Sequence, residues 1–179
     1  MADTYKLTIA GCEREFKKFA VSDKLDIAAF IIFNDVELTV KGCEELLKKV
    51  PEFDVIITPE AKSIPIAYEM ARQSGKPYVV IRKGTKVYMS DPICVKVRSI
   101  TTAREQALYL GQEDVEMIKG KRVLIVDDVI STGESLEAVR KIVEAAGGQE
   151  AATCAYFAEG DAAERKDIIF LEKLPLFFK

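Results

Sequence analysis

Residues 122–126 (RVLIV) include four apolar residues in a row, so a strand here would be apolar on both faces. Such a strand is typical of the centre of a parallel sheet with helices on either side. Two further strands are expected at 54–58 and 78–81, with a helix between them that stops at Gly75. This order of strand, helix and strand predicts an α/β protein with a parallel sheet.

The rest of the chain continues the alternation of strands and helices. Apolar residues at helical spacing, with proline or glycine as stop signals, predict helices at 40–50, 59–72 and 135–146. Alternating or short apolar runs predict strands at 5–10, 150–157 and 167–171, and a hairpin from 93–100 and 107–110.

The composition of the 179 residues excludes several classes of protein. Apolar residues make up 49% and charged residues 31%, and no linker or repeat divides the chain, so we expect a single domain over 1–179. The net charge of −3 argues against a general affinity for nucleic acid. The absence of histidine excludes Ser-His-Asp triads, Cys-His dyads and every histidine-ligated metal site.

Two features favour a soluble, cytoplasmic protein. The longest apolar run covers only residues 27–33, whereas a membrane span needs about 20 residues. No basic segment followed by an apolar stretch suggests a signal peptide. The cysteines are far apart in the sequence and are expected to be buried, reduced thiols: Cys12, Cys43, Cys94 and Cys154.

The strongest chemical signal is the segment 123–135 (VLIVDDVISTGES), a buried strand followed by two carboxylates, a small polar turn and a helix. Backbone N–H groups and hydroxyls at a helix start favour a phosphate, and Gly133 lets the backbone approach it closely. Asp127 and Asp128 suit the hydroxyls of a sugar, or Mg²⁺ held through water. The segment therefore predicts a sugar-phosphate site; the alternative is two strand-end aspartates followed by an ordinary helix cap.

This segment resembles the signature of the type I phosphoribosyltransferases, which use 5-phosphoribosyl-1-pyrophosphate (PRPP). Residues 58–63 (TPEAKS) follow a buried strand and resemble the pyrophosphate loop of the adenine and xanthine enzymes. Arg82, Lys83 and Lys86 resemble the basic element of the same enzymes. Residues 81–104 hold six basic residues and one acid, Asp91, which agrees independently with a site for pyrophosphate.

The resemblance implies the type I phosphoribosyltransferase fold, an α/β fold. Its Rossmann-like core is a parallel sheet with helices on both faces, here about 36–158. A small hood would come from about 1–35 and 159–179. A flexible β-hairpin at 89–110, with residues 99–102 near its tip, would close over the site and exclude water. Relatives are commonly homodimers, so a homodimer is expected.

The implied activity is transfer of the 5-phosphoribosyl group of PRPP to a purine base, with Mg²⁺ as cofactor and pyrophosphate as the leaving group. Asp127 and Asp128 would be the catalytic residues that hold the ribose hydroxyls, and they are possible contacts for Mg²⁺. The 5′-phosphate would be bound by Ser131, Thr132, Gly133, Glu134 and Ser135. The pyrophosphate would be bound by Ala61, Lys62, Ser63, Arg82, Lys83 and Lys86. The base would be contacted by Phe157 and Glu159.

Some residues depart from the family pattern. Glu134 stands where the phosphate turn usually has its second glycine, and the hairpin lacks the glutamate-tyrosine pair of adenine enzymes. Enzymes for 6-oxopurines carry a lysine after the strand at 152–157, where this chain has AEGD, so adenine is slightly favoured. Xanthine or a pyrimidine stays open as the acceptor, as does a PRPP-binding regulatory protein without turnover. Phe157 is equally well explained as a core aromatic.

Overall fold

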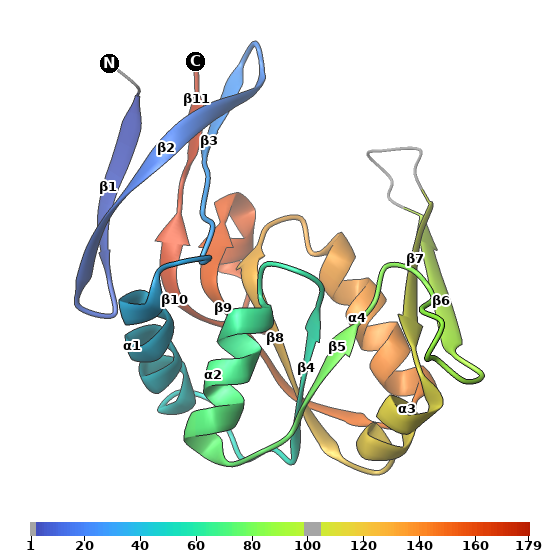
Figure 1. Cartoon of the computed structure of the whole chain (residues 1–179). Helices are drawn as coiled ribbons and strands as arrows, with labels where there is room; N and C mark the ends of the chain where they lie inside the picture. Colours follow the sequence, from blue (N-terminus) through green and yellow to red (C-terminus); the bar gives the residue numbers. More distant parts are fainter. Residues whose placement is uncertain (1–2, 99–104) are drawn as a thin grey trace.

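The computed structural model describes residues 3–98 and 105–179, and it is built around a five-stranded parallel sheet. The strand order is β10-β9-β8-β4-β5, with β8 at the centre (Figure 1). The strands are β4 (Val55–Pro59), β5 (Tyr78–Ile81), β8 (Arg122–Ile130), β9 (Gln149–Glu159) and β10 (Ile169–Leu174). The predicted parallel α/β fold is therefore confirmed, with the 122–126 run in the middle of the sheet.

Side chains of the central strands alternate between two apolar cores, one on each face of the sheet. Val123 and Ile125 enter one core, while Leu124 and Val126 enter the other. The first core also takes the buried faces of α3 (Gln112–Ile118) and α4 (Glu134–Ala145). The second takes those of α1 (Val36–Leu47) and α2 (Ile64–Ser74). Helices thus cover both faces, as expected.

Two helix boundaries differ from the sequence-based expectation. The helix expected at 59–72 begins only at Ile64, because residues 60–63 form a loop beyond the strand that precedes it. The helix expected at 40–50 begins at Val36, because Asp35 caps it by accepting a hydrogen bond from the Leu38 N–H at 3.1 Å. Helix α2 ends at Gly75, whose φ of 69° is the left-handed conformation that glycine adopts readily.

Both ends of the chain build one antiparallel sheet beside the parallel core (Figure 1). Its order is β1-β2-β3-β11, from β1 (Thr4–Ile9), β2 (Cys12–Ser22), β3 (Leu25–Ala28) and β11 (Leu176–Phe178). The C-terminal strand pairs with β3, with Leu176 opposite Ile27. The ring of Phe177 contacts Tyr5 edge-on at 5.3 Å between centroids and lies under the Lys18 ammonium at 4.1 Å.

A separate hairpin, β6 (Ile93–Arg98) and β7 (Glu105–Leu110), packs against α4. Backbone hydrogen bonds in both directions between Arg82 and Tyr109 fasten its base to the end of β5. The expected tip, 99–102, lies outside the described residues. Cys12, Cys43 and Cys154 are buried free thiols, whereas Cys94 is exposed on the edge hairpin, so that part of the expectation is wrong. Within the described ranges no helix is long and apolar enough to cross a membrane.

Asp35 joins the antiparallel sheet to the core, because it caps α1 and also pairs with Arg14 of β2. The Arg14 Nε and Nη2 atoms donate to the two Asp35 carboxylate oxygens at 2.6 and 2.8 Å. Arg14 holds the pKa of Asp35 below its ordinary value. The stabilisation from this pair is therefore present at neutral pH and is lost as pH falls through that lowered pKa.

We expect Asp35→Ala to lower the free energy of unfolding by about 1–2 kcal/mol, because it removes both the cap and the arginine's main partner. Asp35→Asn keeps an oxygen that can accept from the Leu38 N–H, so it should lower the free energy of unfolding by less than alanine does. Urea titrations at neutral and acid pH measure the effect, and the difference from wild type should shrink in acid. An alanine variant as stable as wild type at neutral pH would contradict this role.

Candidate functional site

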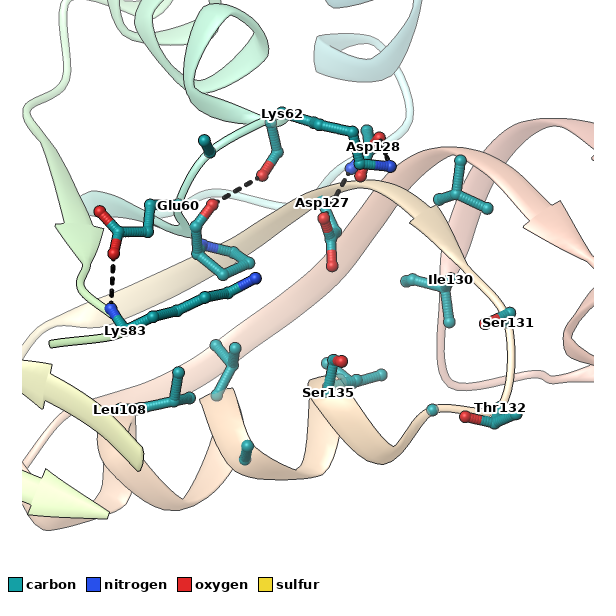
Figure 2. Close-up of a pocket in the computed structure, with 18 residues that line it drawn as sticks. Glu60, Lys62, Lys83, Leu108, Asp127, Asp128, Ile130, Ser131, Thr132 and Ser135 are labelled. Atoms are coloured by element: carbon teal, nitrogen blue, oxygen red, sulfur yellow. Dashed lines mark hydrogen bonds and ion pairs between the residues drawn. The ribbon is translucent and has the colours of Figure 1, made fainter. Parts of the chain in front are cut away.

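A cavity of about 290 Å³ opens at the carboxyl ends of β4 and β8 (Figure 2). The pairing of β4 with β8 ends at Ile57 and Ile125, whereas β8 stays paired with β9 as far as Ile130. The chain leaves β4 towards α2 on one face of the sheet and leaves β8 towards α4 on the other. This divergence is a topological switch point, where ligands of open α/β sheets bind.

The two aspartates lie on β8 just beyond its last pairing with β4. Asp128 is only 4% exposed, and its Oδ2 atom is 2.7 Å from the ammonium of Lys62. The Asp128 N–H donates to Asp127 Oδ1 at 2.8 Å. Burial raises the pKa of Asp127 well above its ordinary value, and the neighbouring charge of Asp128 raises it further. The pair is a concentrated negative charge at the floor of the cavity.

The loop from Glu60 to Ser63 brings Lys62 to this pair. Thr58 Oγ1 donates to Ser63 Oγ at 2.7 Å, and Ser63 Oγ donates to the Pro59 carbonyl at 3.0 Å. Both hydroxyl-bearing residues are buried, so the loop is folded back on the end of its own strand. Ala61, Lys62 and Ser63 all line the cavity. The Lys62 side chain is half exposed and is therefore free to exchange Asp128 for a ligand.

Glu60 has a function that the sequence reasoning missed. Its carboxylate accepts from the Lys83 N–H at 2.7 Å and from Arg82 Nη1 at 3.2 Å. The Lys83 N–H first, and Arg82 in addition, hold the pKa of Glu60 below its ordinary value. Glu60 thus ties the loop to the basic end of β5 (Figure 2). One indication of this function is present in the sequence: an acidic residue is unexpected in a segment that is predicted to bind an anion.

The basic residues of the second expected segment are separated by the fold. Lys83 lines the cavity, whereas Arg82 pairs with Glu60 beside it. Lys86 lies further along the exposed loop and is not part of the cavity lining.

The turn before α4 forms the other wall of the cavity. Gly133 has a φ of 83°, a left-handed conformation that turns the chain directly into the helix. Ser131, Thr132, Gly133 and Ser135 line the cavity, while Glu134 is not part of its lining. The α4 N-terminus therefore faces the cavity, and because the first N–H groups of a helix have no acceptor within the helix, this arrangement suits a phosphate.

The two residues expected at the base are not part of this lining. Phe157 is fully buried, with Phe16 and Phe30 packed edge-on against it at 5.8 and 4.8 Å between ring centroids. Its ring has no exposed face in this structure, which favours the core-aromatic alternative, and its contact with a base stays a prediction. Glu159 ends β9 in a half-buried position. Burial raises its pKa, and the charge of Lys62 opposes that shift.

The carboxylates of the site were tested as a metal centre. The described part of the chain contains no group of three or more acidic or cysteine ligands that could hold a metal ion. Because Asp128 is paired with Lys62, Asp127 is the carboxylate of this pair that could contact a metal ion. Such a donor set does not fit a resident all-protein site. It fits a Mg²⁺ ion that arrives with a phosphorylated substrate and keeps several waters.

The chain is similar to known phosphoribosyltransferases in sequence and in structure. An adenine phosphoribosyltransferase of Lachnoclostridium phytofermentans is 31% identical over 137 residues, which cover 66% of this chain and 71% of that protein. A hypoxanthine/guanine phosphoribosyltransferase of Methanococcus voltae is 42% identical over 96 residues, 54% of this chain and about half (48%) of that protein.

Solved structures give the same relationship. The adenine phosphoribosyltransferase of Thermoanaerobacter pseudethanolicus has a TM-score of 0.68 at 26% identity, covering 79% of this chain and 84% of its own. The yeast adenine phosphoribosyltransferase shares the fold, with a TM-score of 0.72 at 19% identity over 88% and 94% of the two chains. The family model for the phosphoribosyl transferase domain matches residues 33–175. Since that match covers most of the chain, the chain belongs to the phosphoribosyl transferase domain family.

Proposed function

We propose that this protein transfers the 5-phosphoribosyl group of PRPP to a purine base, preferably adenine, with release of pyrophosphate and formation of a nucleoside 5′-monophosphate. One observation carries the proposal: an aspartate pair, a phosphate-type turn and a lysine-bearing loop line a single cavity at the switch point of the sheet. Relatives named as adenine phosphoribosyltransferases support the choice of reaction.

PRPP would lie along the cavity from the α4 turn to the loop at 60–63. The 5′-phosphate occupies the turn, whose N–H groups and hydroxyls supply donors without charge. The ribose hydroxyls donate to Asp127 and Asp128. The pyrophosphate lies against Lys62 and Lys83. Binding at both ends of the sugar holds its C1 atom between the leaving group and the base.

The reaction breaks the bond between C1 and the pyrophosphate oxygen and forms a bond from C1 to a base nitrogen. Positive charge develops on the sugar as the old bond lengthens, and the two carboxylates beside the ring stabilise it. Negative charge grows on the pyrophosphate, where Lys62 and Lys83 neutralise it. Lys62 must leave Asp128 to do so, which frees that carboxylate for the sugar at the same moment. Mg²⁺ bound to the pyrophosphate would add further neutralisation of the leaving group.

The preference for adenine is argued from Glu159 and from what the chain lacks. Glu159 is the last residue of β9 and lies near Lys62, in the segment where enzymes for 6-oxopurines carry a lysine. A carboxyl group there accepts a hydrogen bond from an exocyclic amino group, whereas a 6-oxo group would meet another acceptor. The Methanococcus relative keeps hypoxanthine and guanine as the second candidates.

The direct test is pyrophosphate release from PRPP and Mg²⁺ with adenine, hypoxanthine, guanine, xanthine and uracil offered separately. We expect turnover with adenine at a kcat/KM higher than with any other base. Turnover with another base alone would refute the adenine assignment but keep the reaction. Tight PRPP binding without turnover on any base would instead identify a regulatory protein that uses PRPP as a signal.

A further inference from the structure

Arg165 lies on the turn proposed to bind the 5′-phosphate, although it comes from the distant segment after β9. It is the residue that follows the short 3-10 helix Gly160–Glu164. A Cβ atom added to Gly133 would collide with Arg165 Nη1 and would lie 3.5 Å from its Cζ. The guanidinium therefore covers the α-carbon of Gly133, in the space that any other side chain at this position would need.

The orientation of the guanidinium is fixed by Asp167. Arg165 Nε and Nη2 donate to the two Asp167 carboxylate oxygens at 2.9 and 2.6 Å, a bidentate pair. Arg140 of α4 holds the same carboxylate at 2.9 Å from its Nη2. The counter-ion thus lies behind the guanidinium, and Nη1 lies at the turn. Nη1 has no acceptor within residues 3–98 and 105–179.

Arg165 shares its counter-ion, Asp167, with Arg140, so its guanidinium can still attract an anion at the turn. The N-terminus of a helix carries partial positive charge, so a cation beside it is unfavourable unless a negative ligand lies between them. Arg165 is mostly buried, with a side chain that is 26% exposed, so solvent screens its charge only in part. Asp167 raises the pKa of Arg165 most, and Glu137 of the first turn of α4, which is paired with Arg140 at 2.8 Å, adds a smaller contribution.

We propose that Arg165 is a positioning residue for the 5′-phosphate: it supports the turn at Gly133 and adds its positive charge to the phosphate subsite. This inference rests on the proposed function, since it names a residue of the same site. It predicts that Arg165 acts on the sugar-phosphate end of PRPP and leaves the pyrophosphate end unaffected.

The test compares Arg165→Gln with Arg122→Gln. Arg122 also makes a bidentate pair, with Asp54 at 3.1 and 2.9 Å, but it lies at the amino end of β8, whereas the cavity lies at the carboxyl end. We expect Arg165→Gln to weaken binding of ribose 5-phosphate and to raise the KM for PRPP about tenfold, with kcat and the affinity for inorganic pyrophosphate within about twofold of wild type. Arg122→Gln should leave all four quantities unchanged.

Arg165→Lys keeps the charge without the planar fork, so it should weaken ribose 5-phosphate binding less than glutamine does. If the glutamine variant fails to fold, ribose 5-phosphate binding by Arg165→Lys is compared with that of wild type instead. Equal losses for ribose 5-phosphate and pyrophosphate, or no loss for either, would overturn the inference. A wild-type protein that neither binds PRPP nor releases pyrophosphate would instead refute the proposed function, independently of any Arg165 variant.

Discussion

Replacing Asp127 and Asp128 together by asparagine is expected to lower turnover with PRPP by about 10³-fold or more while leaving the fold intact. Both carboxylates lie beside the position assigned to the sugar, and their charge is what an oxocarbenium-like ring requires. Asparagine has nearly the same shape and can still hydrogen-bond to hydroxyls. The loss therefore measures the negative charge rather than contacts or volume.

The stability of this double variant should equal or exceed that of wild type at neutral pH. Because burial and Asp128 raise the pKa of Asp127 in the folded state, the free energy of unfolding falls as pH rises from the ordinary aspartate pKa to the raised one, and the cost stays constant above it. Asparagine removes that cost, and the half-exposed Lys62 can turn into solvent once its partner is gone. A site that lowers stability for the sake of chemistry is a common feature of enzymes.

Pyrophosphate release and thermal unfolding, measured on the same preparations, check both parts. Asp54→Asn is the matched control. Asp54 also pairs with a basic residue, Arg122, but this pair lies at the amino ends of the strands, away from the cavity. That control should keep full turnover. A double variant with normal turnover would show that the assigned roles of Asp127 and Asp128 are wrong, whatever its stability.

The parts of the fold that the sequence predicted are those whose signals are local. The central strand has four apolar residues in a row at 123–126, so its place in the middle of the sheet could be predicted from that run alone. The strand β2 was not predicted, because Lys17 and Lys18 make it look like a solvated segment. Its partners β1 and β3 are its neighbours in the sequence, whereas β3 also pairs with β11, which comes from the far end of the chain and is only three residues long. Pairing across that sequence distance leaves no local pattern to detect.

The site divides in the same way. The aspartates and the α4 turn are contiguous in the sequence, so their chemistry could be predicted from spacing. Glu60 and Arg165 act through partners more than twenty residues away, at Arg82 and at Gly133, and only the folded chain brings them together. Phe157 is a different case. The rings of Phe16, from β2, and Phe30, from the segment after β3, pack against it, and no local pattern predicts these contacts.

Gly42→Ala should lower the free energy of unfolding by about 2–3 kcal/mol, the reverse of the usual effect of alanine inside a helix. Alanine normally gains about 1 kcal/mol over glycine there. At this position its Cβ atom would lie 2.5 Å from Tyr156 Oη and 2.6 Å from Cε2, well inside van der Waals contact. Overpacking of a rigid core side chain costs about 1–3 kcal/mol, and displacing the ring also breaks its hydrogen bond.

Moving Tyr156 aside is costly, because its ring is fully buried and its hydroxyl donates to the Thr39 carbonyl at 2.8 Å. Helix α1 therefore approaches β9 as closely as a glycine allows. Gly42→Ala combined with Tyr156→Leu should be more stable than the sum of the single effects, since the smaller side chain relieves the clash. Gly84→Ala is the control, because its Cβ would meet nothing within 4 Å and stability should hardly change. Urea unfolding of wild type, Gly42→Ala, Tyr156→Leu and the double variant measures the coupling, and additive single effects would show that α1 and β9 are not in contact through this pair.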